Sequence, residues 1–259
     1  MNVRQLFDLS GRVALVTGGS RGLGLQIAEA LAESGARVAI SARKGEELAQ
    51  AQAHLQGLGA EVCTAVADLS RPESIPPTVA AVLGRWGTID ILVNNAGCNW
   101  AAPAEEYPDE GWRKVMALNL DATFYMCREV GRRAMIPRRS GRIINVASIA
   151  GLAGNPPEIE MYSIAYNTSK GAVVNFTRAL AAEWGRHDIN VNAIAPGFFP
   201  SKMTRATLDR VGERILRATP LGRLGGADDL KGAAVFLASE ASRHVSGQIL
   251  VVDGGAAAA

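Results

Sequence analysis

Short apolar runs alternate with longer amphipathic segments along the whole chain. Each apolar run is rich in Val or Ile, which is typical of buried parallel strands. We therefore expect strands at residues 13–17, 37–41, 61–66, 89–94, 142–147, 190–195 and 248–252. Between them apolar residues recur at helical spacing, and we expect helices at residues 24–34, 46–58, 72–85, 109–135, 165–184 and 228–239.

This alternation predicts an α/β fold of the Rossmann type. We expect a doubly wound parallel sheet of about seven strands, with helices on both faces and right-handed crossovers. No linker, low-complexity tract or repeat interrupts the pattern, so a single domain is expected over residues 1–259. The last four residues, 256–259, are expected to fray.

Composition narrows the class of protein. Hydrophobic residues make up 48% of the chain and charged residues 20%, as in a well-packed globular protein. The formal net charge is only +2, so no field favours nucleic acid or a membrane surface. No apolar run approaches the ~20 residues of a membrane span, and none follows Met1 as a signal peptide would. We expect a cytoplasmic protein with no nucleic-acid or membrane partner.

The cysteines carry no pattern of their own. Cys63, Cys98 and Cys127 are odd in number and far apart, and the chain holds no Cys-x-x-Cys or His-x-x-x-His spacing. Neither a metal site nor a disulfide framework is expected, and a reduced setting fits.

A glycine-rich loop follows the first expected strand and opens a helix. Its residues are Gly18-Gly19-Ser20-Arg21-Gly22-Leu23-Gly24. Free backbone N–H groups and the positive end of the helix dipole suit a pyrophosphate there, and glycines allow close approach. The loop predicts dinucleotide binding, although its spacing differs by one residue from the pattern G-x-G-x-x-G.

The end of the second strand bears on which dinucleotide binds. An NAD site is expected to place an acid there for the ribose 2′-OH, whereas this chain has Ser41 and Ala42 followed by Arg43. Arg21 in the glycine loop adds a second cation. Two guanidinium groups without a carboxylate suit a 2′-phosphate, so NADP(H) is expected in preference to NAD(H). The alternative is that Arg43 and Lys44 only begin a solvated helix.

Tyr166 and Lys170 lie four residues apart in an expected helix, so their side chains share one face. A nearby ammonium favours the phenolate and is expected to lower the pKa of the Tyr, which would make it a general acid/base near neutral pH. The spacing alone is a weak signal, but other motifs accompany it.

Together these motifs resemble the short-chain dehydrogenase/reductase family over residues 9–255. The resemblance rests on Thr17-Gly18-x-x-x-Gly22-x-Gly24, Asp68-Leu69, Asn94-Asn95-Ala96-Gly97, Asn119, Ser148, Tyr166-x-x-x-Lys170 and Pro196-Gly197, in that order. Residues 9–24 are similar to those of both gluconate 5-dehydrogenases and 3-oxoacyl-carrier-protein reductases and do not separate the two.

The resemblance implies four catalytic residues. Tyr166 would deliver a proton to a substrate carbonyl oxygen that Ser148 holds, while NADPH delivers hydride. Lys170 would bind the nicotinamide ribose and lower the Tyr pKa, and Asn119 would tie Lys170 to a chain of waters.

The resemblance also implies a cofactor site and an assembly. Asp68 and Leu69 would cradle the adenine, and the segment after Pro196-Gly197 would cover the nicotinamide. The implied cofactor contacts are Gly18, Ser20, Arg21, Gly22, Leu23, Gly24, Arg43, Asp68, Leu69, Asn95, Ala96, Gly97, Tyr166, Lys170, Pro196, Gly197, Phe199 and Ser201. Relatives are commonly homotetramers built on two long helices, here near 109–135 and 165–184.

One stretch departs from the family pattern. Ser148 and Tyr166 are eighteen residues apart, and residues 155–161 look like an insertion beside the site. The insertion brings Tyr162 to the more usual distance from Ser148, but Tyr166 rather than a Lys stands four residues beyond it. Tyr166 therefore keeps the catalytic role.

The expected function is NADPH-dependent reduction of a ketone to a secondary alcohol, or the reverse. A 3-oxoacyl thioester, a sugar acid such as a keto-gluconate and a small hydrophobic ketone stay open, with the last preferred. A non-catalytic dinucleotide sensor is the alternative of another class.

The expected substrate pocket is mostly apolar and comprises Asn99, Trp100, Leu152, Pro156, Ile159, Met161, Phe198, Phe199 and Met203. Lys202 and Arg205 would serve a carboxylate. A carrier protein would need the cluster Arg128, Arg132, Arg133, Arg138, Arg139 and Arg142.

Overall fold

A seven-stranded parallel sheet forms the centre of the protein. The computed structural model describes residues 1–155 and 159–258. The strands lie in the order β3-β2-β1-β4-β5-β6-β7, and every neighbouring pair is parallel. Their bounds are β1 Val13–Thr17, β2 Arg37–Ala42, β3 Val62–Val66, β4 Ile91–Asn94, β5 Gly141–Val146, β6 Ile189–Pro196 and β7 Ile249–Val252. The expected doubly wound α/β fold is confirmed, and each strand overlaps an expected one.

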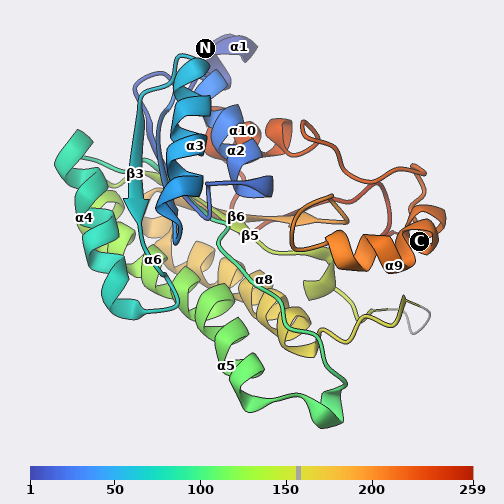
Figure 1. Ribbon diagram of the computed structural model, residues 1–259. Helices are drawn as coiled ribbons and strands as arrows, with labels where there is room; N and C mark the ends of the chain where they lie inside the picture. Colours follow the sequence, from blue (N-terminus) through green and yellow to red (C-terminus); the bar gives the residue numbers. More distant parts are fainter. Residues whose placement is uncertain (156–158, 259) are drawn as a thin grey trace.

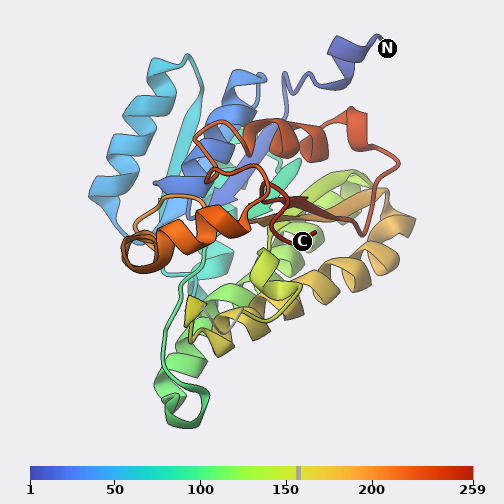
Figure 2. The ribbon, with the colours of Figure 1, turned by 90° about the vertical axis from the view of Figure 1, so that its right-hand side faces the viewer.

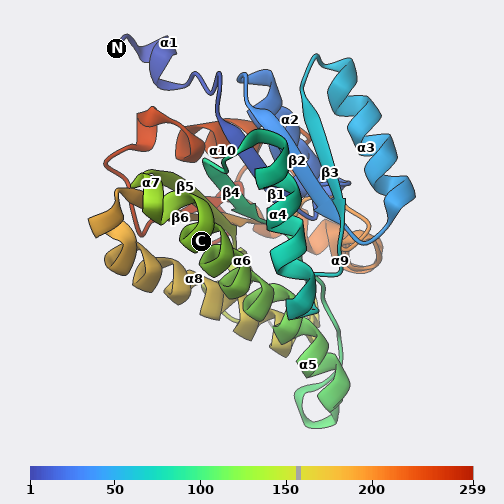
Figure 3. The same cartoon turned by 90° about the vertical axis from the view of Figure 1, so that its left-hand side faces the viewer.

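Helices cover both faces of the sheet (Figure 1). One face carries α2 Gly22–Glu33, α3 Gly45–Gly57 and α10 Lys231–Ala238, whose apolar residues share one buried cluster with the sheet. The other face carries α4 Ile75–Trp86, α6 Ala122–Val130 and α8 Ile164–Trp184, which share a second cluster. Figure 3 shows the sheet between these two layers. This arrangement follows from strands that are apolar on both faces, because each face must be covered.

Shorter helices lie at the amino end and in the connections between these elements. They are α1 Val3–Leu6, the 3-10 turns η1 Pro72–Ser74, η2 Ala104–Glu106, η5 Ile149–Gly151, η7 Gly185–His187 and η8 Glu240–Ser242, and α7 Ile136–Arg138. The helix expected at 72–85 begins later as α4, because the residues from Pro72 first form a 3-10 turn.

The long helix expected at 109–135 is not uniform. It consists of α5 Asp109–Met116, the π turn η3 Ala117–Asp121, α6 and a second π turn, η4 Gly131–Met135. The backbone stays helical where these pieces join, so the axis continues through the wide turns. Such π turns are rare in proteins, and those that occur are often found at functional sites. The first one carries Asn119.

The helix α9 Arg205–Ala218 was not among the expected helices. Its buried residues Val211 and Ile215 pack against Ile159 and the neighbouring Met161 and Leu208. Figure 2 shows α9 in orange, with the yellow segment that precedes α8 below it. The segment after β6 and the segment before α8 therefore meet.

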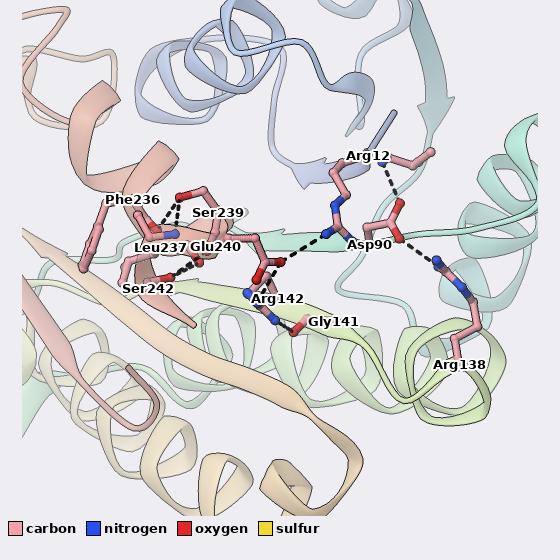
Figure 4. Close-up of polar contacts among 12 residues, drawn as sticks. Arg12, Asp90, Arg138, Gly141, Arg142, Phe236, Leu237, Ser239, Glu240 and Ser242 are labelled. Carbon is pink, nitrogen blue, oxygen red and sulfur yellow. Dashed lines mark hydrogen bonds and ion pairs between the residues drawn. The ribbon is translucent and has the colours of Figure 1, made fainter. Parts of the chain in front are cut away.

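Ion pairs tie the strands together at their amino ends (Figure 4). Asp90 accepts hydrogen bonds from the backbone N–H of Val13 at 2.9 Å and from Arg138 at 2.8 Å. Glu240 accepts from Arg12 at 3.1 Å and from Arg142 at 3.3 Å. These contacts hold the amino-end edge of the sheet. Open α/β sheets bind ligands at the other edge, at the carboxyl ends of the strands.

Candidate active site

The carboxyl ends of β1 and β4 meet where the strand order reverses, which is the usual ligand crevice of such a sheet. The hydroxyl of Thr17, the last residue of β1, accepts from the N–H groups of Asn95 at 2.9 Å and Ala96 at 3.0 Å. Asn95 donates through its amide to the carbonyls of Thr17 at 2.9 Å and Gly18 at 3.1 Å. The loop after β4 is thereby fastened to the glycine-rich loop.

The glycine-rich loop approaches its neighbours too closely for a side chain. A Cβ on Gly24 would lie 2.3 Å from both the Asn95 amide nitrogen and the Gly18 carbonyl oxygen. Arg21 is the N-cap of α2, and its side chain makes no capping hydrogen bond. The N-terminal N–H groups of α2 are therefore available to an anion, as a pyrophosphate requires.

Ser148 is placed by a 3-10 turn that follows β5. Its hydroxyl accepts from the N–H of Ala150 at 3.1 Å and is buried. The same turn leans on α8, because a Cβ on Gly151 would lie only 2.5 Å from the backbone carbon of Lys170. This close approach brings Ser148 to the first turn of α8, where it is hydrogen-bonded to Tyr166.

Tyr166 and Lys170 lie on one face of α8, as expected. The Lys170 Nζ atom is 5.7 Å from the centre of the Tyr166 ring and donates to the carbonyl of Val146 at 2.6 Å. Burial lowers the pKa of Lys170 to about 8. Burial also raises the pKa of Tyr166, and the hydrogen bond with Ser148 opposes that rise. No lowering of the Tyr166 pKa by Lys170 is seen in this structure, where the ammonium donates to a carbonyl, and that effect stays a prediction.

Asn119 connects two parts of the site without facing the cavity. Its amide oxygen accepts from the N–H of Cys98 at 2.8 Å. Its amide nitrogen donates to the Cys98 carbonyl and to the Ser169 hydroxyl, both at 3.0 Å. Ser169 adjoins Lys170, so Asn119 joins the loop after β4 to α8. Its link to Lys170 through water stays a prediction.

A single cavity of about 480 Å³ joins these parts. It is lined by most of the expected residues: Gly18, Ser20, Arg21, Gly22, Leu23, Gly24, Arg43, Leu69, Asn95, Ala96, Gly97, Ser148, Tyr166, Lys170, Pro196, Gly197, Phe199 and Ser201. Its size is within the range of ligand sites. Ser41 also lines it, and the buried Ser41 hydroxyl has no hydrogen-bond partner among the described residues. Loop, cavity and hydroxyl together fit a dinucleotide.

Asp68 does not line the cavity, unlike its neighbour Leu69. Its carboxylate accepts from the N–H of Ser70 at 3.2 Å and from the Ser70 hydroxyl at 2.7 Å. Burial acts to raise the pKa of Asp68, but these hydrogen bonds and the charges of Arg43 and Arg71 together hold it below its ordinary value. Asp68 thus shapes a turn, and its contact with adenine stays a prediction.

The expected substrate residues divide between two places. Phe199 and Met203 line the cavity, together with Lys202. Ile159, Met161 and Phe198 belong instead to the apolar cluster under α9. Pro156 lies outside the described residues. The remaining three, Asn99, Trp100 and Leu152, are not among the residues that line the cavity.

Sequence reasoning missed Glu47, which lines the cavity from the first turn of α3. Its carboxylate pairs with Arg21 at 2.9 Å and with Lys44 at 3.5 Å. The sequence did indicate this position, because an acid in the first turn of the helix after β2 lies beside the carboxyl end of β2. Ala67, Leu118 and Thr204 were missed as well. The described residues hold no cluster suited to a metal ion and no helix able to cross a membrane.

Comparison with known proteins yields full-length matches. The family model described as Enoyl-(Acyl carrier protein) reductase matches residues 18–257. Gluconate 5-dehydrogenase of Gluconobacter oxydans (strain 621H) is 42% identical over 98% of both chains. The 3-oxoacyl-[acyl-carrier-protein] reductase FabG of Chlamydia trachomatis serovar D is 40% identical over 96% of this chain and 98% of its own. A gluconate 5-dehydrogenase from Burkholderia cenocepacia J2315, crystallised with NADP and tartrate, superposes with a TM-score of 0.93 at 38% identity and covers 100% of both chains.

Proposed function

The chain belongs to the short-chain dehydrogenase/reductase family and is an oxidoreductase, and we propose that it interconverts a small ketone and its secondary alcohol with NADP(H). One observation carries the proposal. The cavity that Ser148, Tyr166 and Lys170 line also receives Arg21, Arg43 and Lys44. A group able to donate a proton and a group of cations suited to a 2′-phosphate therefore share one site.

The cofactor's contribution is the hydride, and the protein supplies binding and the proton. The α2 N-terminus and the glycine-rich loop would bind the pyrophosphate. Arg21 and Arg43 would bind the 2′-phosphate, which favours NADP(H) over NAD(H). A Burkholderia relative, crystallised with NADP, supports this choice.

The proposed proton donor is Tyr166. The Ser148 hydroxyl would hold the substrate oxygen, and the Tyr166 phenol would donate its proton to that oxygen during reduction. The raised pKa of Tyr166 keeps the phenol protonated near neutral pH, which suits reduction. Lys170, charged below its pKa of about 8, would favour the phenolate left after transfer.

A small substrate is favoured over one carried on an acidic protein. Four arginines of the basic cluster already form ion pairs, Arg132 and Arg133 with Glu129, Arg138 with Asp90 and Arg142 with Glu240. Arg139 donates to the carbonyl of Arg186 at 2.8 Å, and Arg128 lies over the ring of Tyr125 at 4.9 Å. Cations that already have partners within the chain are less available to an acidic partner.

A sugar acid is the second candidate, because Lys202 is exposed and lines the cavity. Glu160, which would repel a carboxylate, is paired with Arg210 at 3.4 Å. The gluconate 5-dehydrogenases among the relatives point the same way.

The test compares kcat/KM with NADPH for a hydrophobic ketone, 5-keto-gluconate and a 3-oxoacyl thioester on its carrier. We expect the hydrophobic ketone to have the highest kcat/KM of the three. A preference of about a hundredfold, or roughly 2.7 kcal/mol, for either other substrate contradicts the choice. Loss of 5-keto-gluconate reduction in Lys202→Ala, with ketone reduction retained, would establish the second candidate.

We also propose a homotetramer in a cytoplasmic setting. Trp112 on α5, Phe124 on α6 and Ile164 on α8 are large apolar side chains that lie exposed on the two long helices. The cysteines of the described residues are free, as in a reduced compartment. Sedimentation equilibrium should give a species of four chains of 27.2 kDa each, and a stable monomer at micromolar concentration contradicts this.

A further inference from the structure

The cation group at the adenosine end of the cavity contains one carboxylate. Arg21, Arg43 and Lys44 line this part of the cavity beside the end of β2, and Glu47 lines it with them. Oxygen Oε1 of Glu47 accepts from Arg21 at 2.9 Å and pairs with Lys44 at 3.5 Å. The same carboxylate oxygen therefore engages two of the three cations.

Glu47 is held in this place by the fold. It stands in the first turn of α3, after the extended residue Lys44 that caps the helix. The glycine-rich loop adjoins the end of β2, because the N–H of Gly19 donates to the carbonyl of Ser41 at 3.2 Å. Arg21 and Glu47 are twenty-six residues apart in sequence, yet this contact between the glycine-rich loop and β2 brings them together.

We propose that Glu47 competes with the 2′-phosphate of NADP(H) for Arg21 and thereby limits the preference for NADP(H) over NAD(H). This inference rests on the proposed function. A phosphate is a stronger acceptor than one carboxylate oxygen, so Arg21 leaves Glu47 when the phosphate binds. NAD(H) carries no such group, and the pair stays intact when it binds. Glu47 is a specificity-determining residue on this account, and it takes no part in proton or hydride transfer.

The size of the effect follows from exposure. The Arg21 side chain is 50% exposed and that of Glu47 27%, so water and salt weaken their interaction. Replacing the carboxylate by an amide should tighten NADPH binding about two- to fivefold at physiological ionic strength. The gain should grow as salt is lowered, because screening weakens. NADH binding should change little.

Glu47→Gln is tested against a matched control on the same helix turn. Glu46→Gln removes the same charge beside the same helix N-terminus, but Glu46 is exposed and is not among the residues lining the cavity. Fluorescence titration gives Kd for NADPH and NADH without any substrate. We expect the ratio of the two constants to shift toward NADPH in Glu47→Gln and to stay unchanged in Glu46→Gln. Weaker NADPH binding in Glu47→Gln, or equal shifts in both variants, overturns the proposal.

A second background tests the competition itself. The Arg21→Ala variant has no guanidinium at this position to compete for, so adding Glu47→Gln should raise the affinity for NADPH much less than it does in the unmodified protein. An undiminished gain would show that Glu47 repels the phosphate directly, which overturns the competition. The unmodified protein separates this proposal from the function on which it rests. If that protein binds NADH more tightly than NADPH, the proposed cofactor is wrong, whatever the variants do.

Discussion

Gly151→Ala should impair catalysis far more than cofactor binding. A Cβ at this position would lie 2.5 Å from the backbone carbon and 2.7 Å from the carbonyl oxygen of Lys170. Ordinary contact begins at 3.4 Å, so the 3-10 turn and α8 must separate by about 0.9 Å. Main chain cannot rotate away as a flexible side chain can, and Ser148 therefore moves relative to Tyr166.

The displacement sets the magnitude of both effects. A misplacement of ~1 Å at a reacting centre can cost about a hundredfold in rate, so kcat for ketone reduction should fall by that order. Overpacking should lower the free energy of unfolding by about 1–3 kcal/mol, measured by urea denaturation. The Kd for NADPH should stay within about threefold, because the glycine-rich loop lies on other elements.

Gly154→Ala is the control in the same loop. A Cβ there meets nothing within 4 Å, so rate and stability should stay close to those of the unmodified protein. A Gly151→Ala variant that keeps kcat within threefold would contradict this prediction, because it would show that the turn and the helix separate without disturbing Ser148.

Three further outcomes are expected. In the double variant Ala42→Asp, Arg43→Ala, the ratio of the Kd values for NADPH and NADH should shift toward NADH by about ten- to a hundredfold, which is what losing one charge-assisted contact costs. Unchanged Kd values in fluorescence titration would contradict this. The kcat/KM for reduction should fall as pH rises through about 8, because Lys170 then loses its charge, and a profile that stays flat above that pH would contradict it. Asp90→Ala should lower the free energy of unfolding by about 1–3 kcal/mol, because the buried N–H of Val13 loses its acceptor, whereas the exposed Asp109→Ala should change it by less than about 0.5 kcal/mol.

The strands could be predicted from the sequence because their signal is local. Short runs rich in Val and Ile mark the strands without reference to the rest of the chain, and in the central strand β1 every residue is buried. Three of the proposed catalytic residues could be brought together for a similar reason. Ser148 follows the end of a strand, Tyr166 and Lys170 lie one helical turn apart, and a parallel sheet brings strand ends together.

Other features depend on contacts between distant segments. The π turn at Asn119 leaves the backbone helical, and the contact of its side chain with Cys98 has no signature in the residues around it. The raised pKa of Tyr166 follows from burial, which the spacing to Lys170 does not reveal. The α9 helix did carry a signal, since Leu208, Val211 and Ile215 recur at helical spacing among charged residues.

The Tyr166→Phe variant, measured beside Tyr162→Phe, tests whether Tyr166 supplies the proton. The Tyr162 ring is 53% exposed and is not among the residues lining the cavity, whereas Tyr166 lines it next to Ser148. With NADPH and a ketone substrate, kcat should fall by about a hundredfold or more in Tyr166→Phe, while the Kd for NADPH stays nearly unchanged. Tyr162→Phe should change kcat far less. A functioning Tyr166→Phe beside an inactive Tyr162→Phe would contradict this assignment, because the proton would then come from Tyr162.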